Sequence, residues 1–140
     1  MLKELNILKD LQSLRHVILL ETGPLTEPES LALYNFTLFH NFRLMITYHT
    51  QGKEIYWNFQ NYAPEEAEKI GKLFATASGY ILTNPEFNSS FAGYKDWFLQ
   101  EYRKPGYTIE AGLGINPLPI SQFNEIYNNN IEILVLGAIV

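Results

Sequence analysis

Histidine, aspartate and glutamate supply candidate metal-binding and acid–base side chains in this chain, and cysteine is absent. That absence excludes disulfides, thiolate metal sites and a thiol nucleophile. Histidine occurs at positions 16, 40 and 49, and none of the three begins an H-x-x-E or H-E-x-x-H pattern. The chain also lacks G-x-S-x-G and a P-loop. Local patterns alone therefore do not predict a hydrolase or a metal site.

His49 is the most informative histidine. It follows the stretch 43–48, whose β-branched and aromatic residues predict a buried strand, and it precedes Gly52, which breaks that pattern. Open α/β sheets place ligand-binding groups at such strand ends. The alternative is an imidazole that is only hydrogen-bonded at the end of a strand.

Glu110 is the second residue of interest. It lies inside a short predicted strand, 107–110, which ends before Gly112. Burial there would raise the pKa of the carboxyl group and suit it to act as a general base. The alternative is a strand residue whose side chain points to solvent.

One helix expected upstream of these residues has a clear start signal. Thr26 is predicted to be its N-cap, with Pro28 in the first turn and Glu29 at the capping-box position. The helix, over about 27–41, is apolar on most sides, which predicts burial on more than one face.

The other expected elements alternate between helix and strand. This alternation predicts an α/β fold in which helices cover a largely buried sheet. The expected helices are at 2–14, 64–78, 96–102 and 119–136, the strands at 16–20, 43–48, 54–57 and 107–110, and a loop at 84–93.

Composition limits the partners and the location that we expect. The 140 residues fit one domain, and 10 Lys plus Arg against 15 Asp plus Glu give a net charge of −5, so no nucleic-acid partner is expected. The longest apolar run, Ile133–Val140, is too short for a membrane helix, which needs about 20 residues. The first residues lack the apolar core of a signal peptide, so a cytoplasmic location is expected.

Several segments, taken in order, resemble one family. They are 48–57 (YHTQGKEIYW), 93–98 (GYKDWF) and 105–112 (PGYTIEAG), supported by 23–30 and 116–123. Together they resemble the C-terminal half of a zinc carboxypeptidase of the carboxypeptidase A superfamily, and within it the bacterial γ-D-glutamyl-diaminopimelate endopeptidases. The resemblance, over about 23–137, implies a partial mixed sheet flanked by helices, as in the C-terminal half of a zinc-carboxypeptidase-like (phosphorylase/hydrolase-like) fold.

The resemblance also implies roles for particular residues. His49 matches a zinc ligand, and Glu110 matches the general base that activates a zinc-bound water, so the two are expected at neighbouring strand ends on one side of the sheet. Lys95, before the family's Asp-Trp pair, matches a residue of the specificity pocket, where a cation would suit a substrate carboxylate; the alternative is an ordinary solvated lysine. Tyr94 is a loose counterpart of a mobile family tyrosine, whose own position holds Asn88.

Two departures from the family shape the functional expectation. This sequence contains no match to the family's H-x-x-E zinc motif or to the N-terminal half that carries it. Residues 1–22 are expected to be a helical lead segment without a family counterpart, and residues 23–140 are expected to form the carboxypeptidase-like domain. A catalytic zinc needs about three protein ligands, so we expect a truncated peptidase of peptidoglycan-type peptides that binds zinc weakly and is inactive alone.

Other readings of the same departures stay open. One is a non-catalytic module that binds such peptides or pairs with another chain, and another is a relic without function. We expect the isolated chain to self-associate, or to require a missing N-terminal half, because unpaired strand edges and apolar surface recruit other chains.

Overall fold

The computed structural model describes residues 25–85 and 93–140. Its contacts divide the chain into two units, residues 1–42 and 43–140. The helix predicted over 2–14, the strand predicted over 16–20, and the position of Asn88 all lie outside the described residues.

Helix α2, Pro28–Phe39, is the regular element described in the first unit. Proline pushes the preceding residue to an extended backbone, so Glu27, with φ −80° and ψ 131°, is the N-cap, and the prediction of Thr26 is wrong. The predicted burial on more than one face is also wrong, since Thr37 is the one buried residue of α2 and Phe39 is 86% exposed. Burial needs a partner surface, and the described part of this unit holds no second element.

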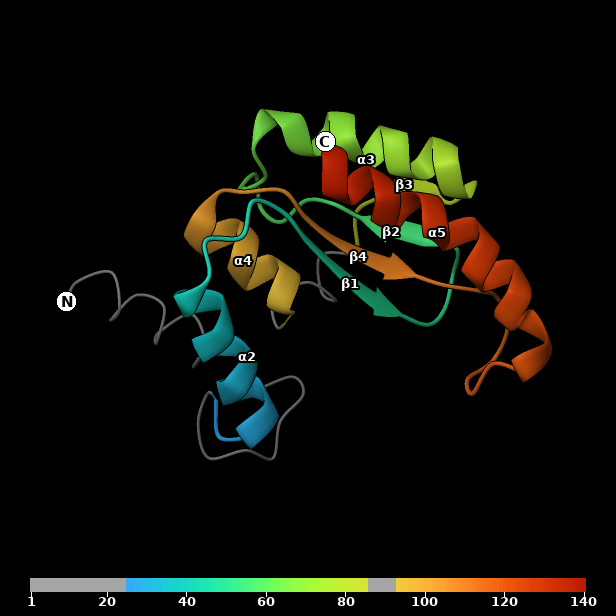
Figure 1. Ribbon diagram of the computed structural model, residues 1–140, viewed down its shortest axis with the longest axis horizontal. Helices are drawn as coiled ribbons and strands as arrows, with labels where there is room; N and C mark the ends of the chain where they lie inside the picture. The colour runs from blue at the N-terminus through green and yellow to red at the C-terminus, as the bar shows by residue number, and fades with distance from the viewer. Residues whose placement is uncertain (1–24, 86–92) are drawn as a thin grey trace. The chain divides into compact units, whose positions relative to one another are not determined.

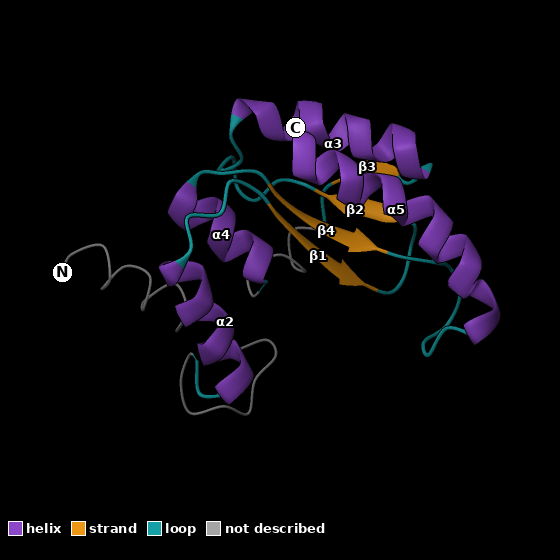
Figure 2. Ribbon diagram, in the orientation of Figure 1, coloured by secondary structure: helices purple, strands orange, loops and turns teal. Residues whose placement is uncertain are grey.

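The second unit is built on a four-stranded mixed sheet (Figure 2). The strands are β1 (Met45–His49), β2 (Glu54–Tyr56), β3 (Ile81–Thr83) and β4 (Gly106–Glu110), in the order β1-β4-β2-β3. Strand β4 pairs in parallel with β1 and antiparallel with β2, and β2 pairs in parallel with β3. The predicted α/β class and the mixed sheet implied by the resemblance are confirmed.

Two helices lie side by side over one face of the sheet (Figure 1): α3, Glu65–Ser78, and α5, Phe123–Ile139. The core between them and the sheet contains Phe74 and Tyr107, whose rings meet edge to face at 4.9 Å between centroids. The hydroxyl of Tyr107 donates to the carbonyl of Ala67 at 2.7 Å. This buried donor is therefore satisfied, as a buried hydroxyl must be.

Helix α4, Tyr94–Tyr102, packs on the opposite face at the beginning of β1 and β4. Gly106 permits this approach, because a Cβ atom there would lie 3.4 Å from both Met45 Cγ and Phe98 Cδ1. Helix α4 packs at the beginning of these strands, and His49 and Glu110 are the last residues of β1 and β4 at their other ends.

Some element boundaries differ from the sequence-based expectations. Strand β3 was not predicted, because three residues carry too little periodicity to detect. Helix α4 starts two residues before the expected 96, since Gly93 is its N-cap, and the last helix divides into a 3₁₀ turn, η3 (Ile120–Gln122), and α5. Among the described helices, none is long and apolar enough to cross a membrane.

Candidate functional site

His49 and Glu110 end two adjacent parallel strands. They are partners in the β1–β4 register, and the backbone N–H of Ala111 donates to the carbonyl of His49 at 2.8 Å. Side chains of register partners point to the same face of a sheet. The predicted proximity of these two residues is therefore confirmed, while their chemical roles stay predictions.

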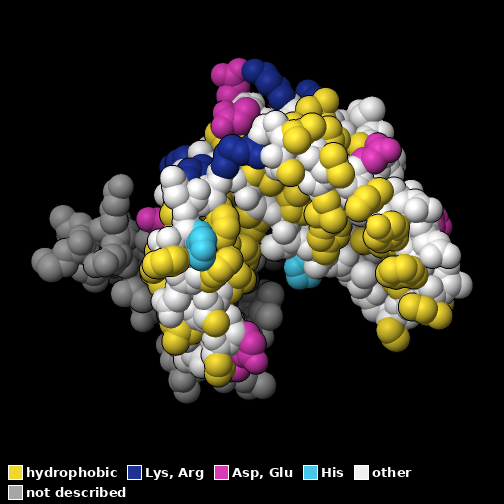
Figure 3. Space-filling model, in the orientation of Figure 1, with side chains coloured by type: hydrophobic (Ala, Val, Ile, Leu, Met, Phe, Trp, Pro, Cys, Tyr) yellow, Lys and Arg dark blue, Asp and Glu magenta, His cyan; other side chains and the backbone are white. Residues whose placement is uncertain are grey.

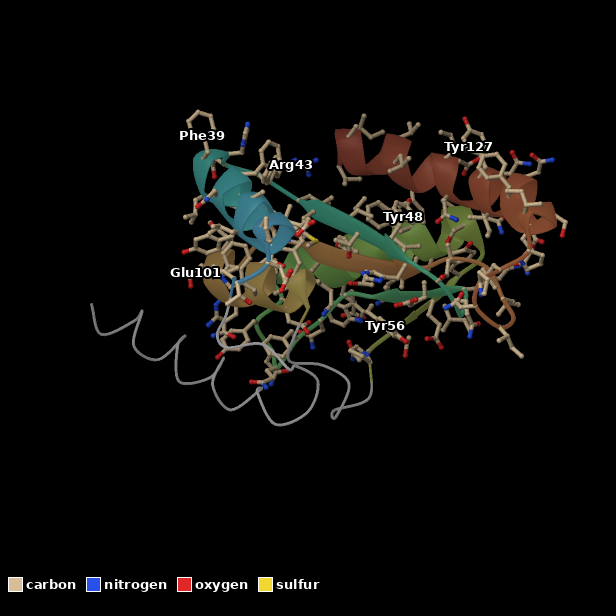
Figure 4. All side chains as sticks on the ribbon, turned by 90° about the horizontal axis from the view of Figure 1, so that it is seen from below. Phe39, Arg43, Tyr48, Tyr56, Glu101 and Tyr127 are labelled. Carbon is tan, nitrogen blue, oxygen red and sulfur yellow. The ribbon has the colours of Figure 1, made fainter. Side chains whose placement is uncertain are left out.

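Strand β2 brings a second carboxylate to the same row. Glu54 is the register partner of Glu110, and Tyr56 donates from its hydroxyl to Glu54 Oε2 at 2.7 Å. Ile55, between them, points the other way and is fully buried in the core. In Figure 4, Tyr56 lies on the side of the sheet away from α5, whereas Tyr48 lies on the α5 side.

These side chains line an open cleft with a volume of about 630 Å³. Its walls come from the open face of the sheet, from the residues after β3 and from the start of α4. The lining residues are His49, Glu54, Tyr56, Thr83, Asn84, Pro85, Gly93, Lys95, Asp96, Thr108 and Glu110.

Lys95 lines the cleft and is 4% exposed, so it is not an ordinary solvated lysine. Its Nζ forms an ion pair with Asp96 Oδ1 and donates to the carbonyl of Asn58 at 2.9 Å. Two of the three ammonium donors are thus used within the protein. The pair fixes the first turn of α4 against the loop after β2.

Tyr94, the other residue expected to contact substrate, is not among the residues that line the cleft. It is the first residue of α4, and its ring stacks on Trp97 with centroids 5.8 Å apart. The structure therefore brings His49, Lys95 and Glu110 to one cleft, and Tyr94 is not part of its lining.

Burial raises the pKa of the Glu110 carboxyl above its usual range. The charge of His49 partly offsets this by lowering the pKa, and the nearby carboxylate of Glu54 raises it further. A carboxylate that holds its proton more tightly is also a better proton acceptor near neutral pH. The environment of Glu110 is therefore suited to a general base.

The turns after β1 and β4 hold the two strand ends together. Gly52 donates its N–H to the carbonyl of Gly112 at 2.8 Å. Gly112 has φ +77°, and a Cβ atom there would lie 2.6 Å from Leu118 Cδ1, so the position requires glycine. Gln122 accepts from the N–H of Leu113 and donates to its carbonyl at 2.7 Å.

The donor set does not by itself fit a catalytic zinc. Within residues 25–85 and 93–140, no three His, Asp or Glu side chains are grouped to hold a metal ion. A catalytic zinc is bound by about three protein ligands, and His49 supplies one imidazole. Any zinc site that includes His49 therefore needs ligands beyond those that the described residues bring together.

Sequence reasoning assigned no role to Glu54, Tyr56, Asn84 or Thr108. One signal was available for two of them, because Glu54-Ile55-Tyr56 alternates polar and apolar as a half-buried strand does. Nothing in the sequence, however, shows that β2 pairs antiparallel with β4 and so opposes Glu54 to Glu110.

Two curated proteins are similar to this chain, and no family model matches it. The "Gamma-D-glutamyl-L-diamino acid endopeptidase 1" of Lysinibacillus sphaericus is 45% identical over 115 residues, which are 82% of this chain and 28% of that protein. The "Uncharacterized protein YqgT" of Bacillus subtilis (strain 168) is 45% identical over 112 residues, 80% of this chain and 30% of that protein. The chain thus spans less than a third of either relative.

Among solved structures, bovine thrombin-activatable fibrinolysis inhibitor, in complex with tick carboxypeptidase inhibitor, has the same fold. The TM-score is 0.67 at 17% identity, over 84% of this chain and 46% of the bovine chain. At this identity the likeness concerns the fold alone. Together with the 45% identical endopeptidase, it confirms the predicted resemblance to the C-terminal portion of the zinc carboxypeptidase superfamily.

Proposed function

We propose that this chain, a homologue of a gamma-D-glutamyl-diamino acid endopeptidase with a carboxypeptidase-like fold, supplies the general base and part of the substrate-binding wall of a peptidase site. The observation that carries the proposal is the register of His49 with Glu110 at the edge of an open cleft. The proposed substrate is a peptide of the peptidoglycan type, with a γ-D-glutamyl-diamino acid bond.

Glu110 is proposed to take the proton of the water that attacks the peptide carbonyl. Its raised pKa supports this role, because a general base works best when its pKa approaches the operating pH. Lys95 is proposed to bind a substrate carboxylate with the donor that Asp96 and Asn58 leave unused. Tyr94 is proposed to lie beside the substrate at the start of α4.

His49 is proposed as one ligand of a zinc whose remaining ligands come from another polypeptide segment. The free edge of β1 supports such a partner, because no strand of the described residues pairs with its outer side. Exposed apolar side chains along α5, visible in Figure 3, give the same support: Phe123, Tyr127, Leu134, Val135 and Ile139. The same surfaces would let the isolated chain self-associate.

A paired assay tests the proposal on the 140-residue chain and on a form completed with the rest of the Lysinibacillus enzyme. Hydrolysis of a γ-D-glutamyl-diamino acid peptide and bound zinc are measured together. The short chain should bind well under one equivalent of zinc and show no turnover. The completed form should bind one equivalent of zinc and hydrolyse the peptide.

Substitutions in the completed form then separate the two roles. Glu110→Gln should lower turnover by about 10³-fold and keep the zinc, since it removes a base and not a ligand. His49→Ala should lose zinc and turnover together, and Glu101→Gln, on the exposed side of α4, should change neither. Turnover with one zinc in the short chain, or full activity of Glu110→Gln, would contradict the proposal.

A non-catalytic peptide-binding module is the second candidate. It is favoured by an open cleft whose described residues lack a three-ligand group. A completed form that binds the peptide without hydrolysing it would support this candidate instead.

A further inference from the structure

The charges that line the cleft do not balance. Among the described lining residues the single Lys or Arg is Lys95, and its ion pair with Asp96 makes those two residues neutral together. His49 faces Glu110 across the β1–β4 register, and its charge lowers the pKa of the Glu110 carboxyl. Glu54 has no Lys or Arg partner among the described lining residues. Among the described lining residues, the acidic side chains therefore outnumber the basic ones.

The carboxylates of Glu54 and Glu110 oppose each other in the sheet. Glu54 and Glu110 are partners in the antiparallel β2–β4 register. Like charges directly opposite on one face of an antiparallel pair are destabilising. Gly52 adds no side chain between them, although a Cβ atom there would lie 3.5 Å from Glu54 Oε2 and 3.7 Å from Glu110 Cβ.

The cation nearest in sequence does not relieve this repulsion. Lys53, directly before Glu54, forms its ion pair with Glu125 of α5. Because α5 covers the other face of the sheet, the charge of Lys53 is directed away from the cleft. An ammonium group brought by a ligand would supply the positive charge that Glu54 lacks among the described lining residues.

We propose that Glu54 is a specificity-determining residue that binds an ammonium group of the peptide substrate. The inference rests on the proposed function, because it names the substrate group that the same cleft takes. Tyr56 holds the Glu54 carboxylate in place through Oε2, which leaves Oε1 for the ligand. An ammonium carries three donors and can bind through one oxygen.

Two other cations fit the site less well. A guanidinium binds a carboxylate best through two parallel hydrogen bonds to both oxygens, and Tyr56 already donates to one oxygen of Glu54. A metal ion would need a group of ligands, and the described residues contain no such group of three. The geometry therefore favours a side-chain amine of the substrate.

Peptide binding to the 140-residue chain tests the inference directly. The probes are the tripeptide Ala-γ-D-Glu-Lys and the same peptide acetylated on the lysine Nε, titrated in metal-free buffer and followed by NMR chemical shifts. Acetylation removes the charge and should weaken binding by about tenfold, as expected for loss of one charged hydrogen bond. Glu54→Gln should bind both peptides equally, and Tyr56→Phe should show a reduced preference.

Glu101→Gln is the matched control, because it makes the same charge change on α4 at an exposed residue that does not line the cleft (Figure 4). It should keep the tenfold preference. The inference is overturned if the unaltered chain binds both peptides alike or binds neither, or if a folded Glu54→Gln chain keeps the preference. Glu110-dependent hydrolysis of both peptides at equal rates in the completed form would overturn this inference while leaving the proposed function intact.

Discussion

The two faces of the sheet differ sharply within a single strand. In β4, Tyr107 and Ile109 are fully buried beneath α3 and α5, whereas Thr108 and Glu110 line the cleft. Successive side chains of a strand point to opposite faces. The five residues of β4 can therefore pack into the core on one face and line the cleft on the other. The packed apolar face holds the polar face in position.

The polar face is nevertheless not uniformly open to solvent. Lys95 and Asp96, at its α4 end, are as deeply buried as many core residues, whereas Glu110 is only half-buried. The buried ion pair thus lies at the α4 end of the cleft, and the candidate base lies at the other end.

The largest expected effect comes from breaking the apolar face. Phe74→Ala removes a fully buried ring that packs on Tyr107, and it should lower the free energy of unfolding by about 4 kcal/mol. Leu73→Ala is the control, because Leu73, the neighbour of Phe74 on the same helix, is 48% exposed, and its truncation should cost less than about 1 kcal/mol. Urea unfolding followed by circular dichroism measures both, and equal losses would contradict the assignment of the core.

A smaller loss is expected from the buried end of the polar face. Asp96→Asn leaves the ammonium of Lys95 buried without its partner charge, which should cost about 3 kcal/mol. The comparison is Glu65→Gln, which breaks the exposed pair of Glu65 with Lys69 and should have no measurable effect. The same urea titration applies, and an Asp96→Asn chain as stable as the parent would show that the pair contributes nothing.

The smallest effect concerns the pH dependence of stability at Glu110. Its pKa is raised in the folded chain, so the folded state binds this proton more tightly than the unfolded state. Stability should therefore fall as the pH rises from the ordinary value of 4.5 through the folded pKa. Glu110→Gln has no such proton and should lose less stability than the parent between pH 4.5 and pH 7.5.

Glu132→Gln, at an exposed position on α5, is the control for this measurement. Its stability should follow the parent across the same pH range. A Glu110→Gln chain with the parent's full pH dependence would show that burial of Glu110 does not set its affinity for the proton.

Much of the fold could be predicted from local sequence. Gly79 ends α3 in the left-handed conformation, as its position after the amphipathic run predicts. Strand ends at His49 and Glu110 are marked by the glycines that follow them. The exposure of α2 could not be predicted, because an apolar sequence indicates that a helix has surface to bury but does not show which surface covers it.

The sequence by itself predicted the α/β class and placed His49 and Glu110 at or next to strand ends, because periodicity and turn residues are local signals. Only the tertiary structure decided that Glu54 opposes Glu110 and that Lys95 is buried against Asp96. The physical reason is strand order and helix packing. β2 meets β4 across more than fifty residues of chain, and the register that results depends on the shared core of Ile55 and Ile109 rather than on either segment alone.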